Sequence, residues 1–482
     1  MKRFGSIALV LGLLFATIPM DVQAQAEHHW YNQFGNRSLL LSGAVVAGVS
    51  DMAAVFYNPG RLANLDEKGF LLSARAYQVV QTKIQDGLGE NLDLDQSLFG
   101  SMPGLGAGSF TLPFAPESTF AYSFLTRRNR ADHLFLRTEG EGQIIEAIPG
   151  EELFIGTVDL GSSIEEEWFG LSWAKQVSQK ASVGVTAFGT ALTRGNAVAL
   201  DLRALDEQNA AAVLLQTRAY NFTTYGLLLK AGLAVDLSPI QLGLTVTTPQ
   251  MRVMGSGSTR FEDLRAGVDT TADGIADDRF TLNRQDELRA EVKSPLSVGF
   301  GLSYMMEKTT LHVSGEWFSS VASYSVMDPD PFTSQSSGAQ WEYQVVDELK
   351  SVFNFGVGLE WHLSESFSAY ASGGSDVSAA PDDVSRNLGM GSDINLNTLG
   401  ANALHLGGGV SFKTRWLDLT TGLTYAGSNE DLERPLTLPS EGSGSGLSGD
   451  NKANMSIKTW RILLGFSIPT GDRANDGGGS GN

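Results

Sequence analysis

Apolar residues alternate with small or polar residues along most of the chain, from about residue 69 to residue 468. The stretch 353–361, FNFGVGLEW, is typical, since an apolar side chain stands at every second position. The stretches 240–247, 296–304 and 460–468 follow the same rule. Successive side chains of a β-strand point to opposite faces, so this period predicts strands with one apolar face and one small or polar face.

Fourteen segments have this character. They lie near 68–82, 106–114, 117–139, 150–176, 180–198, 213–236, 239–254, 287–305, 308–327, 342–362, 366–379, 403–413, 415–427 and 456–469. Several exceed the roughly 9–11 residues that a tilted strand needs to cross a bilayer. We expect those strands to extend beyond the membrane.

Short and long connections alternate between the segments. The long polar connections are 83–105, 255–286, 328–341, 380–402 and 428–455, and between them the chain reverses within a few residues. Short turns on one side and long loops on the other are typical of a membrane barrel. An even strand number also closes the sheet without leaving an edge in lipid. The predicted fold is an all-β, transmembrane antiparallel β-barrel of about 14 strands.

The N-terminal sequence has the three parts of a secretory signal peptide. Lys2 and Arg3 are followed by an apolar core at 7–18 and by small residues at Ala24 and Ala26. That core is too short to span a bilayer, although a short N-terminal anchor is the alternative. We therefore expect a signal peptide at 1–26, a separate segment at 27–66, a barrel at 67–469 and a flexible periplasmic tail at 470–482. The predicted location is the outer membrane of a Gram-negative bacterium.

Composition excludes several classes of function. The chain has no cysteine, which excludes disulfides, thiolate chemistry and cysteine zinc sites. Its formal net charge of −20 disfavours a nucleic-acid partner, which needs clustered Lys and Arg. The sequence also lacks a nucleophile elbow and a phosphate-binding loop in a strand–turn–helix context, so we predict that the protein is not an enzyme.

The segment 27–66 does not alternate and carries a motif of its own. Residues 43–65 read GAVVAGVSDMAAVFYNPGRLANL, in which Asn58-Pro59-Gly60 is a turn signal that would end one short helix. This stretch resembles the FadL-type family of long-chain fatty-acid and hydrocarbon transport proteins, which carry a small-residue stretch, an Asp and a run like FYNPAGLA before the first strand. The alanine between proline and glycine is missing here, and Arg61 follows the glycine.

The resemblance implies that residues 27–66 form a hatch in the barrel lumen. It implies passive transport: a hydrophobic molecule such as a long-chain fatty acid is captured in an apolar pocket and released sideways when the hatch shifts. The residues carried over to this hatch are Asp51, Phe56, Tyr57, Asn58, Pro59 and Gly60. A plain turn at Asn58-Pro59-Gly60, packed by the two aromatic rings, is the alternative for the motif.

One polar loop resembles a calcium site. Asp269, Thr271, Asp273 and Asp277 fall at positions 1, 3, 5 and 9 of a calcium-loop pattern, with Gly274 at the sharp turn. The twelfth position holds Phe280 instead of a glutamate, so a solvated acidic outer loop is the alternative. Apart from a structural calcium ion there, no cofactor is expected.

Two other functions remain open for the same fold. FadL-like barrels also act as binding or assembly partners of a surface protein-secretion system, and a polar-solute porin would need a wide hydrated lumen. A buried apolar pocket favours transport, whereas an exposed apolar patch on the outer loops favours the secretion-system partner. The expected partners are a hydrophobic small molecule or fatty acid and outer-membrane lipids. A closed barrel with its own plug can work as a monomer.

Overall fold

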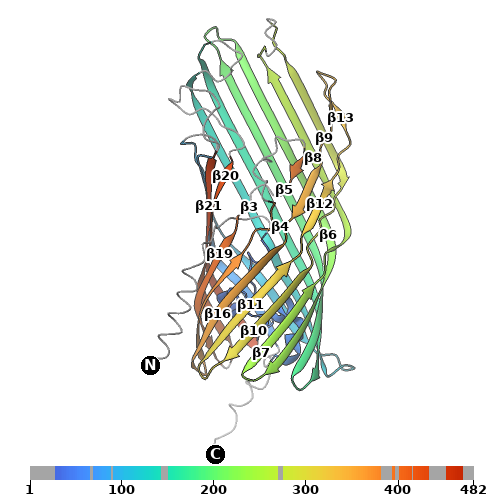
Figure 1. Ribbon diagram of the computed structural model, residues 1–482, viewed down its shortest axis with the longest axis vertical. Helices are drawn as coiled ribbons and strands as arrows, with labels where there is room; N and C mark the ends of the chain where they lie inside the picture. Colours follow the sequence, from blue (N-terminus) through green and yellow to red (C-terminus); the bar gives the residue numbers. More distant parts are fainter. Residues whose placement is uncertain are drawn as a thin grey trace, which may run out of the picture.

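The computed structural model describes residues 28–65, 69–87, 91–142, 150–269, 275–381, 393–396, 401–414, 416–433 and 452–469. In this part of the chain, fourteen antiparallel strands form a ring that closes where β5 pairs with β6 (Figure 1). The strands of the ring are β1 (Gly69–Gln85), β2 (Leu94–Phe110), β3 (Ser118–Gly142), β4 (Glu152–Ser178), β5 (Ala181–Leu205), β6 (Ala211–Leu237), β7 (Ile240–Thr247), β10 (Ser297–Met305), β11 (Thr309–Phe318), β16 (Val352–Ser364), β17 (Phe367–Asp376), β19 (Ala403–Lys413), β20 (Asp418–Glu433) and β21 (Lys452–Pro469). The predicted fold and strand number are confirmed.

One side of the barrel is much taller than the other. Strands β3 to β6 have 25 to 27 residues each, whereas β7 has 8 and β10 has 9. Above β7, the strands β8 (Met251–Ala266) and β9 (Arg279–Arg289) continue the wall along the upper half of β6. The short strands β12 (Val321–Met327), β13 (Phe332–Thr333), β14 (Gln340–Trp341), β15 (Val345–Leu349) and β18 (Ile394–Asn395) form two small additional sheets.

Two of the predicted outer loops are wrong over much of their length. The predicted loop 83–105 contains the upper half of β2, which pairs with β1 up to Ile84↔Leu94. The predicted loop 255–286 contains most of β8 and part of β9, which pair with one another. The outer face of a strand above the bilayer meets water and needs no apolar residue, so a largely polar sequence still forms a hydrogen-bonded ladder there. The alternation is lost in these two regions, although it continues beyond a membrane-spanning length in the segments 117–139 and 150–176.

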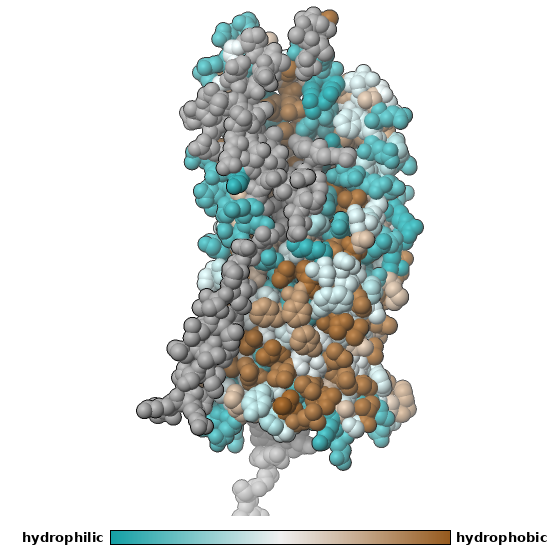
Figure 2. All heavy atoms as spheres, in the orientation of Figure 1, coloured by the Kyte–Doolittle hydropathy of each residue, from teal (hydrophilic) through white to brown (hydrophobic). Residues whose placement is uncertain are grey.

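The outer surface carries an apolar band around its lower half. Figure 2 shows apolar side chains gathered over the lower part of the visible face and polar side chains above it. Exposed members of the band include Leu242, Leu244, Phe300, Leu302 and Phe353. These residues lie on strands joined by the short turns at 238–239, 306–308 and 365–366. The band is the surface that a bilayer covers in a transmembrane barrel. Among the described residues, no helix has the length and apolar character needed to cross a membrane.

Residues 28–65 fill the lower lumen as a plug. The plug contains α2 (Asn36–Leu40), α3 (Ala54–Tyr57) and the 3-10 helix η1 (Pro59–Asn64). Its buried side chains pack against inward-facing residues of the ring, including Leu71, Leu125 and Phe188. The single short helix expected before Asn58 is replaced by two, separated by turns. Asn58 ends α3 as predicted, and Pro59 then starts η1 at a position where its missing N–H costs nothing.

Candidate functional site

The Asn58-Pro59-Gly60 turn docks directly on two wall strands. The fully buried Asn58 side chain donates from Nδ2 to the carbonyls of Val46, at 2.8 Å, and Leu233, at 3.0 Å. Its Oδ1 accepts from the N–H of Gly60 at 3.0 Å. One amide group therefore joins the plug backbone, the turn and β6.

Glycines on the wall make this contact possible. A β-carbon added to Gly184 on β5 would lie 2.3 Å from the carbonyl oxygen of Pro59. A β-carbon on Gly60 would lie 2.9 Å from the carbonyl oxygen of Gly232 on β6. Ser182 adds a hydrogen bond of 2.8 Å from its Oγ to the carbonyl of Gly60. The turn is thus an anchor of the plug as well as a chain reversal.

The other residues carried over from the resemblance have different environments. The Asp51 carboxylate accepts from the N–H of Ala53 at 2.9 Å and so holds the turn before α3. The Tyr57 hydroxyl is buried and joins the N–H of Phe34, at 3.0 Å, to the Gln33 side chain, at 2.7 Å. Desolvation by burial raises the pKa of Tyr57, so the hydroxyl stays protonated. Of these side chains, Phe56 and Tyr57 reach the cavity above the plug.

Arg61, which departs from the family pattern, also anchors the plug. Its guanidinium is buried and lies 2.6 Å from the Asp236 carboxylate at the lower end of β6. Asn64 donates to the other oxygen of the same carboxylate at 3.2 Å. The sequence places the cation but cannot show its partner, since 175 residues separate Arg61 from Asp236.

A second ion pair anchors helix α2 of the plug. Arg37 on α2 is bound to Glu360 on β16, and the same guanidinium lies 2.9 Å from His312 on β11. Arg37 also donates to the carbonyl of Gly48 at 2.8 Å. Sequence analysis missed this cluster, because its members come from three segments with no shared motif.

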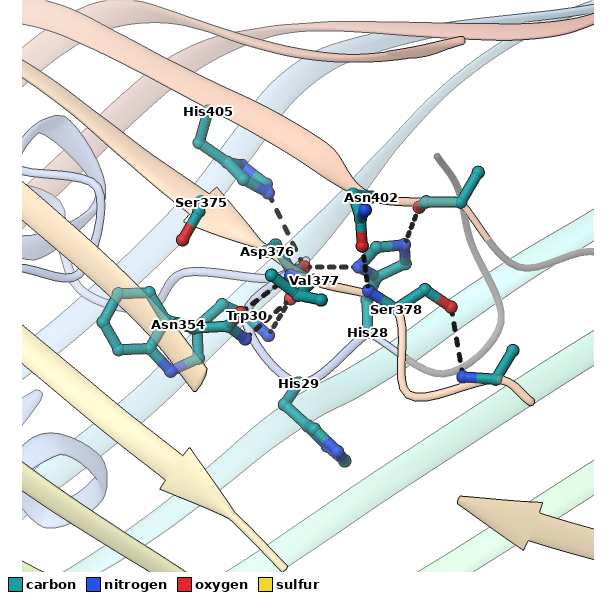
Figure 3. Close-up of polar contacts among 12 residues, drawn as sticks. His28, His29, Trp30, Asn354, Ser375, Asp376, Val377, Ser378, Asn402 and His405 are labelled. Atoms are coloured by element: carbon teal, nitrogen blue, oxygen red, sulfur yellow. Dashed lines mark hydrogen bonds and ion pairs between the residues drawn. The ribbon is translucent and has the colours of Figure 1, made fainter. Parts of the chain in front are cut away.

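The N-terminal end of the plug is held by Asp376, at the upper end of β17 (Figure 3). The fully buried carboxylate lies 3.1 Å from Nδ1 of His28 and accepts from the N–H of Trp30 at 3.0 Å. His405, from β19, and Asn354, from β16, also point at it, at 3.6 and 3.1 Å. Four groups from three parts of the chain, namely the start of the plug, β16 and β19, therefore share one carboxylate.

Two cavities lie above the plug. The lower chamber, of about 1190 Å³, has Phe56 on its floor and Trp168, Leu192 and Leu228 among its apolar lining. The upper chamber, of about 1140 Å³, is lined higher in the lumen by Leu134, Leu160, Ile164, Val198, Met455 and Ile457. Arg127, Arg128 and Arg194 line both chambers. An apolar ligand would therefore meet cations where the chambers join.

The cations of the lower chamber differ in their partners. Arg128 is paired with Glu166 at 2.9 Å. Arg127 and Lys230 are both buried, and neither forms an ion pair within the described residues. Both stand by the Phe56 ring, with Arg127 Cζ at 5.6 Å and Lys230 Nζ at 4.8 Å from its centroid. Two buried cations beside an open apolar space can bind an anionic group.

The carboxylates of the same chamber are already engaged. Glu316 accepts from Trp30 Nε1 at 2.9 Å and from the Ser297 hydroxyl at 2.7 Å. Glu166 accepts from Trp168 Nε1 at 2.7 Å, in addition to its pair with Arg128. Neither carboxylate forms an ion pair with Arg127 or Lys230 within the described residues, although their charges act on these cations from a distance.

The wall beside the chambers contains a seam between β2 and β3. Their ladder extends over six residue pairs, from Phe110↔Phe120 to Leu105↔Leu125, and no pair is formed above it in the described residues. Pro103 has no N–H to donate just above this point, and β3 bulges between Thr126 and Arg128. The plug contacts the bulge, because Asn32 donates to the Arg127 carbonyl at 2.8 Å and Arg127 donates to the His29 carbonyl at 2.6 Å.

The predicted calcium loop stays a prediction. Thr271, Asp273 and Gly274 lie outside the described residues. Asp269 and Asp277 are described, and the N–H of Asp277 donates to the carbonyl of Val268 at 2.8 Å. Within the described part of the chain, no group of three His, Cys, Asp or Glu side chains is arranged to hold a metal ion. The predicted signal peptide at 1–26 and tail at 470–482 also lie outside it.

Comparison with known proteins gives matches at the level of structure. The chain matches no family profile and no curated protein sequence. A Pseudomonas aeruginosa FadL homologue is 12% identical with a TM-score of 0.56, covering 92% of this chain and all of its own. The P. putida toluene transporter TodX (11%, TM-score 0.55) and the monoaromatic hydrocarbon channel CymD (12%, TM-score 0.51) each cover 91% of this chain, and 99% and 98% of their own. The chain therefore has the fold of the FadL-type barrels.

Proposed function

We propose that this protein carries hydrophobic molecules with an anionic head group, such as long-chain fatty acids, passively across the outer membrane. The observation that carries the proposal is the pair of buried cations, Arg127 and Lys230, flanking Phe56 in an apolar chamber. An alkane would gain nothing from these charges, whereas a carboxylate would form charge-assisted hydrogen bonds with them. The solved relatives described as toluene or monoaromatic hydrocarbon channels support hydrophobic cargo in general.

The two chambers suit the two parts of such a molecule. The carboxylate lies between Arg127 and Lys230, and the alkyl chain extends along the apolar lining of the upper chamber. Burial of the chain contributes about 0.8 kcal/mol per methylene. Few charged side chains are needed, because the apolar wall provides most of the affinity and the cations select the head group.

Release is proposed to occur sideways through the β2–β3 seam. The seam begins six pairs above the short turn that joins β2 to β3, which places it within the apolar band. Asn32 and His29 bind the bulged segment of β3 where the ladder ends, so a shift of the plug would pull on this part of the wall. A cargo that leaves into lipid avoids exposing its alkyl chain to water. In this proposal residues 27–66 act as the hatch.

The test compares binding of radiolabelled oleate and of labelled hexadecane, an alkane that cannot form a cation–π contact, to the purified full chain. Removing one charge-assisted contact costs about 1.5–3 kcal/mol, so Lys230→Met should weaken oleate binding at least about tenfold and leave hexadecane binding unchanged. Lys180→Met, at an exposed turn, is the matched control. Equal loss for both ligands would overturn the head-group assignment. Absence of oleate binding, with equal oleate uptake by cells that carry or lack the protein, would overturn fatty-acid transport and favour the secretion-system partner.

A further inference from the structure

The barrel wall has a second interruption, away from the β2–β3 seam. The β7–β10 ladder ends at Thr247↔Ser297, and β8–β9 pairing starts only at Ser256↔Arg289, with one further bond from the Ala290 N–H to the Gly255 carbonyl. No backbone hydrogen bond joins 248–254 to 291–296 within the described structure. The adjoining strand β6 runs past this level without a break.

The sequence prevents this interruption from closing into a ladder. Pro249 stands on one edge and Pro295 on the other, and neither has an N–H to donate. Two contacts that involve side chains bridge the gap instead: the N–H of Gln250 donates to Ser294 Oγ at 2.8 Å, and Arg252 Nε donates to the Ala290 carbonyl at 2.9 Å. Such bridges separate more readily than a continuous ladder, because they break one at a time.

The lower chamber reaches both edges of the interruption. Gln250 lines it from one edge, and Lys293, Ser294 and Pro295 line it from the other. Lys293 is also exposed, with its Nζ 4.5 Å from the centroid of the Tyr324 ring. A charged side chain that lines the chamber and is itself exposed supports an opening of the chamber at this edge.

The height of the interruption differs from that of the β2–β3 seam. Eight residue pairs of the β7–β10 ladder lie between the interruption and the lower turns. Only six residue pairs of the β2–β3 ladder lie between the seam and its lower turn. Since roughly 9–11 residues of a tilted strand cross a bilayer, the interruption lies near the outer boundary of the membrane. The apolar side chains Met251, Val253 and Met254 are exposed beside it. An acyl chain in the outer boundary would contact these three residues, and its carboxylate would contact Lys293.

We propose that this interruption is a side inlet, through which an amphipathic acid passes from the outer boundary of the membrane into the lower chamber. The inference rests on the proposed function, since it names the path by which that cargo reaches Arg127 and Lys230. Lys293 meets the head group at the surface, and the two buried cations hold it inside. The inlet and the seam lie at different heights, which separates loading from release.

The absence of cysteine allows a direct test with a reversible crosslink. The double variant Gln250→Cys/Ser294→Cys would close the inlet when oxidised. The matched control, Leu242→Cys/Leu302→Cys, joins two residues that are already partners in the β7–β10 ladder. Loading of spin-labelled stearate into the purified full chain is followed over time, before and after reduction.

We expect the oxidised inlet pair to slow loading about tenfold or more relative to its own reduced form, with equilibrium occupancy unchanged. The control pair should load at one rate in both redox states. Equal loading rates for the oxidised and reduced inlet pair, in a protein that binds stearate, would overturn the inlet and leave the proposed function standing. If neither the wild-type chain nor any reduced variant binds stearate, the proposed function itself is overturned, and the inlet with it.

Discussion

The amide oxygen of Asn58 lies so close to Gly232 that a β-carbon added to the glycine would stand 2.2 Å from it. The plug thus rests on the wall through backbone and amide atoms, with no room for a side chain between them. A β-carbon added to Gly184, on the neighbouring strand, would likewise lie 2.3 Å from the carbonyl oxygen of Pro59. The position of the plug therefore depends on two wall residues as much as on its own motif.

Gly232→Ala should displace the plug. Overpacking of this kind costs about 1–3 kcal/mol, because neither the wall backbone nor the Asn58 amide can move freely. The free energy of unfolding in urea and ion conductance in a planar bilayer would report the change, with lower stability and larger conductance expected. Gly189→Ala on β5 is the matched control, since its β-carbon would meet only the Phe169 carbonyl, at 4.0 Å. Equal effects of both substitutions would contradict a specific contact.

Asn58→Asp should loosen the plug with almost no change in volume. The carboxylate can still accept from the N–H of Gly60, but it cannot donate to the carbonyls of Val46 and Leu233. A buried acceptor left without a donor costs about 1–3 kcal/mol. Amide hydrogen exchange of residues 43–65 would rise more than exchange of the barrel strands. Unchanged protection in this stretch would show that other contacts, such as Arg61–Asp236, hold the plug without it.

Acid should weaken the N-terminal end of the plug through His29. Burial first, and then the charges of Arg127 and Arg128, lower the pKa of His29 to about 3, and its ring stacks on Phe318 at 4.0 Å between centroids. In the unfolded chain the His29 imidazole binds a proton as the pH falls through about 6.5, whereas in the folded chain the buried ring stays neutral until about pH 3. The contribution of neutral His29 to the free energy of unfolding is therefore fully present above pH 6.5 and decreases as the pH falls towards 3.

His29→Phe keeps the ring stack and removes the titration. The slope of the unfolding free energy between pH 6.5 and pH 4 should fall by up to about 1.4 kcal/mol per pH unit relative to wild type. Thermal unfolding at a series of pH values measures this slope, with His133→Phe, at an exposed position, as the control. Parallel pH profiles for wild type and His29→Phe would contradict the assignment.

Asn32→Ala should change the rate of ligand release. Loss of the hydrogen bond to the Arg127 carbonyl frees the bulged segment of β3 from the plug, and we expect release of bound oleate to speed up about fivefold or more, equivalent to about 1 kcal/mol. Stopped-flow release from the purified protein measures this rate. Asn221→Ala, at an exposed position of β6 that lines neither chamber, is the control. Release at the wild-type rate would indicate that the plug and the seam are not coupled.

The sequence by itself determined the kind of barrel. A strand that spans a bilayer needs an apolar face toward lipid, so apolar residues occur at every second position over most of each spanning segment, such as 353–361 and 460–468. The same constraint is absent above the membrane, which is why the upper half of β2 and most of the β8–β9 pair were predicted as loops. The local turn at Asn58-Pro59-Gly60 was also readable, since it depends on adjacent residues.

Only the tertiary structure decided what the plug and the chambers do. Arg61, Arg37 and Asp376 each have a partner that lies far away in the chain and is brought close only by closing the ring, namely Asp236, Glu360 and Trp30, at separations of 175, 323 and 346 residues. Lys230 looks like an ordinary strand residue in the sequence, yet the fold buries it beside Phe56 and Arg127, where it forms no ion pair with the acidic side chains that the structure describes. The wall interruptions likewise depend on register between strands. Ion-pair partners, burial and strand register depend on which residues become neighbours in the folded barrel, and the spacing of residue types along the chain does not specify those neighbours.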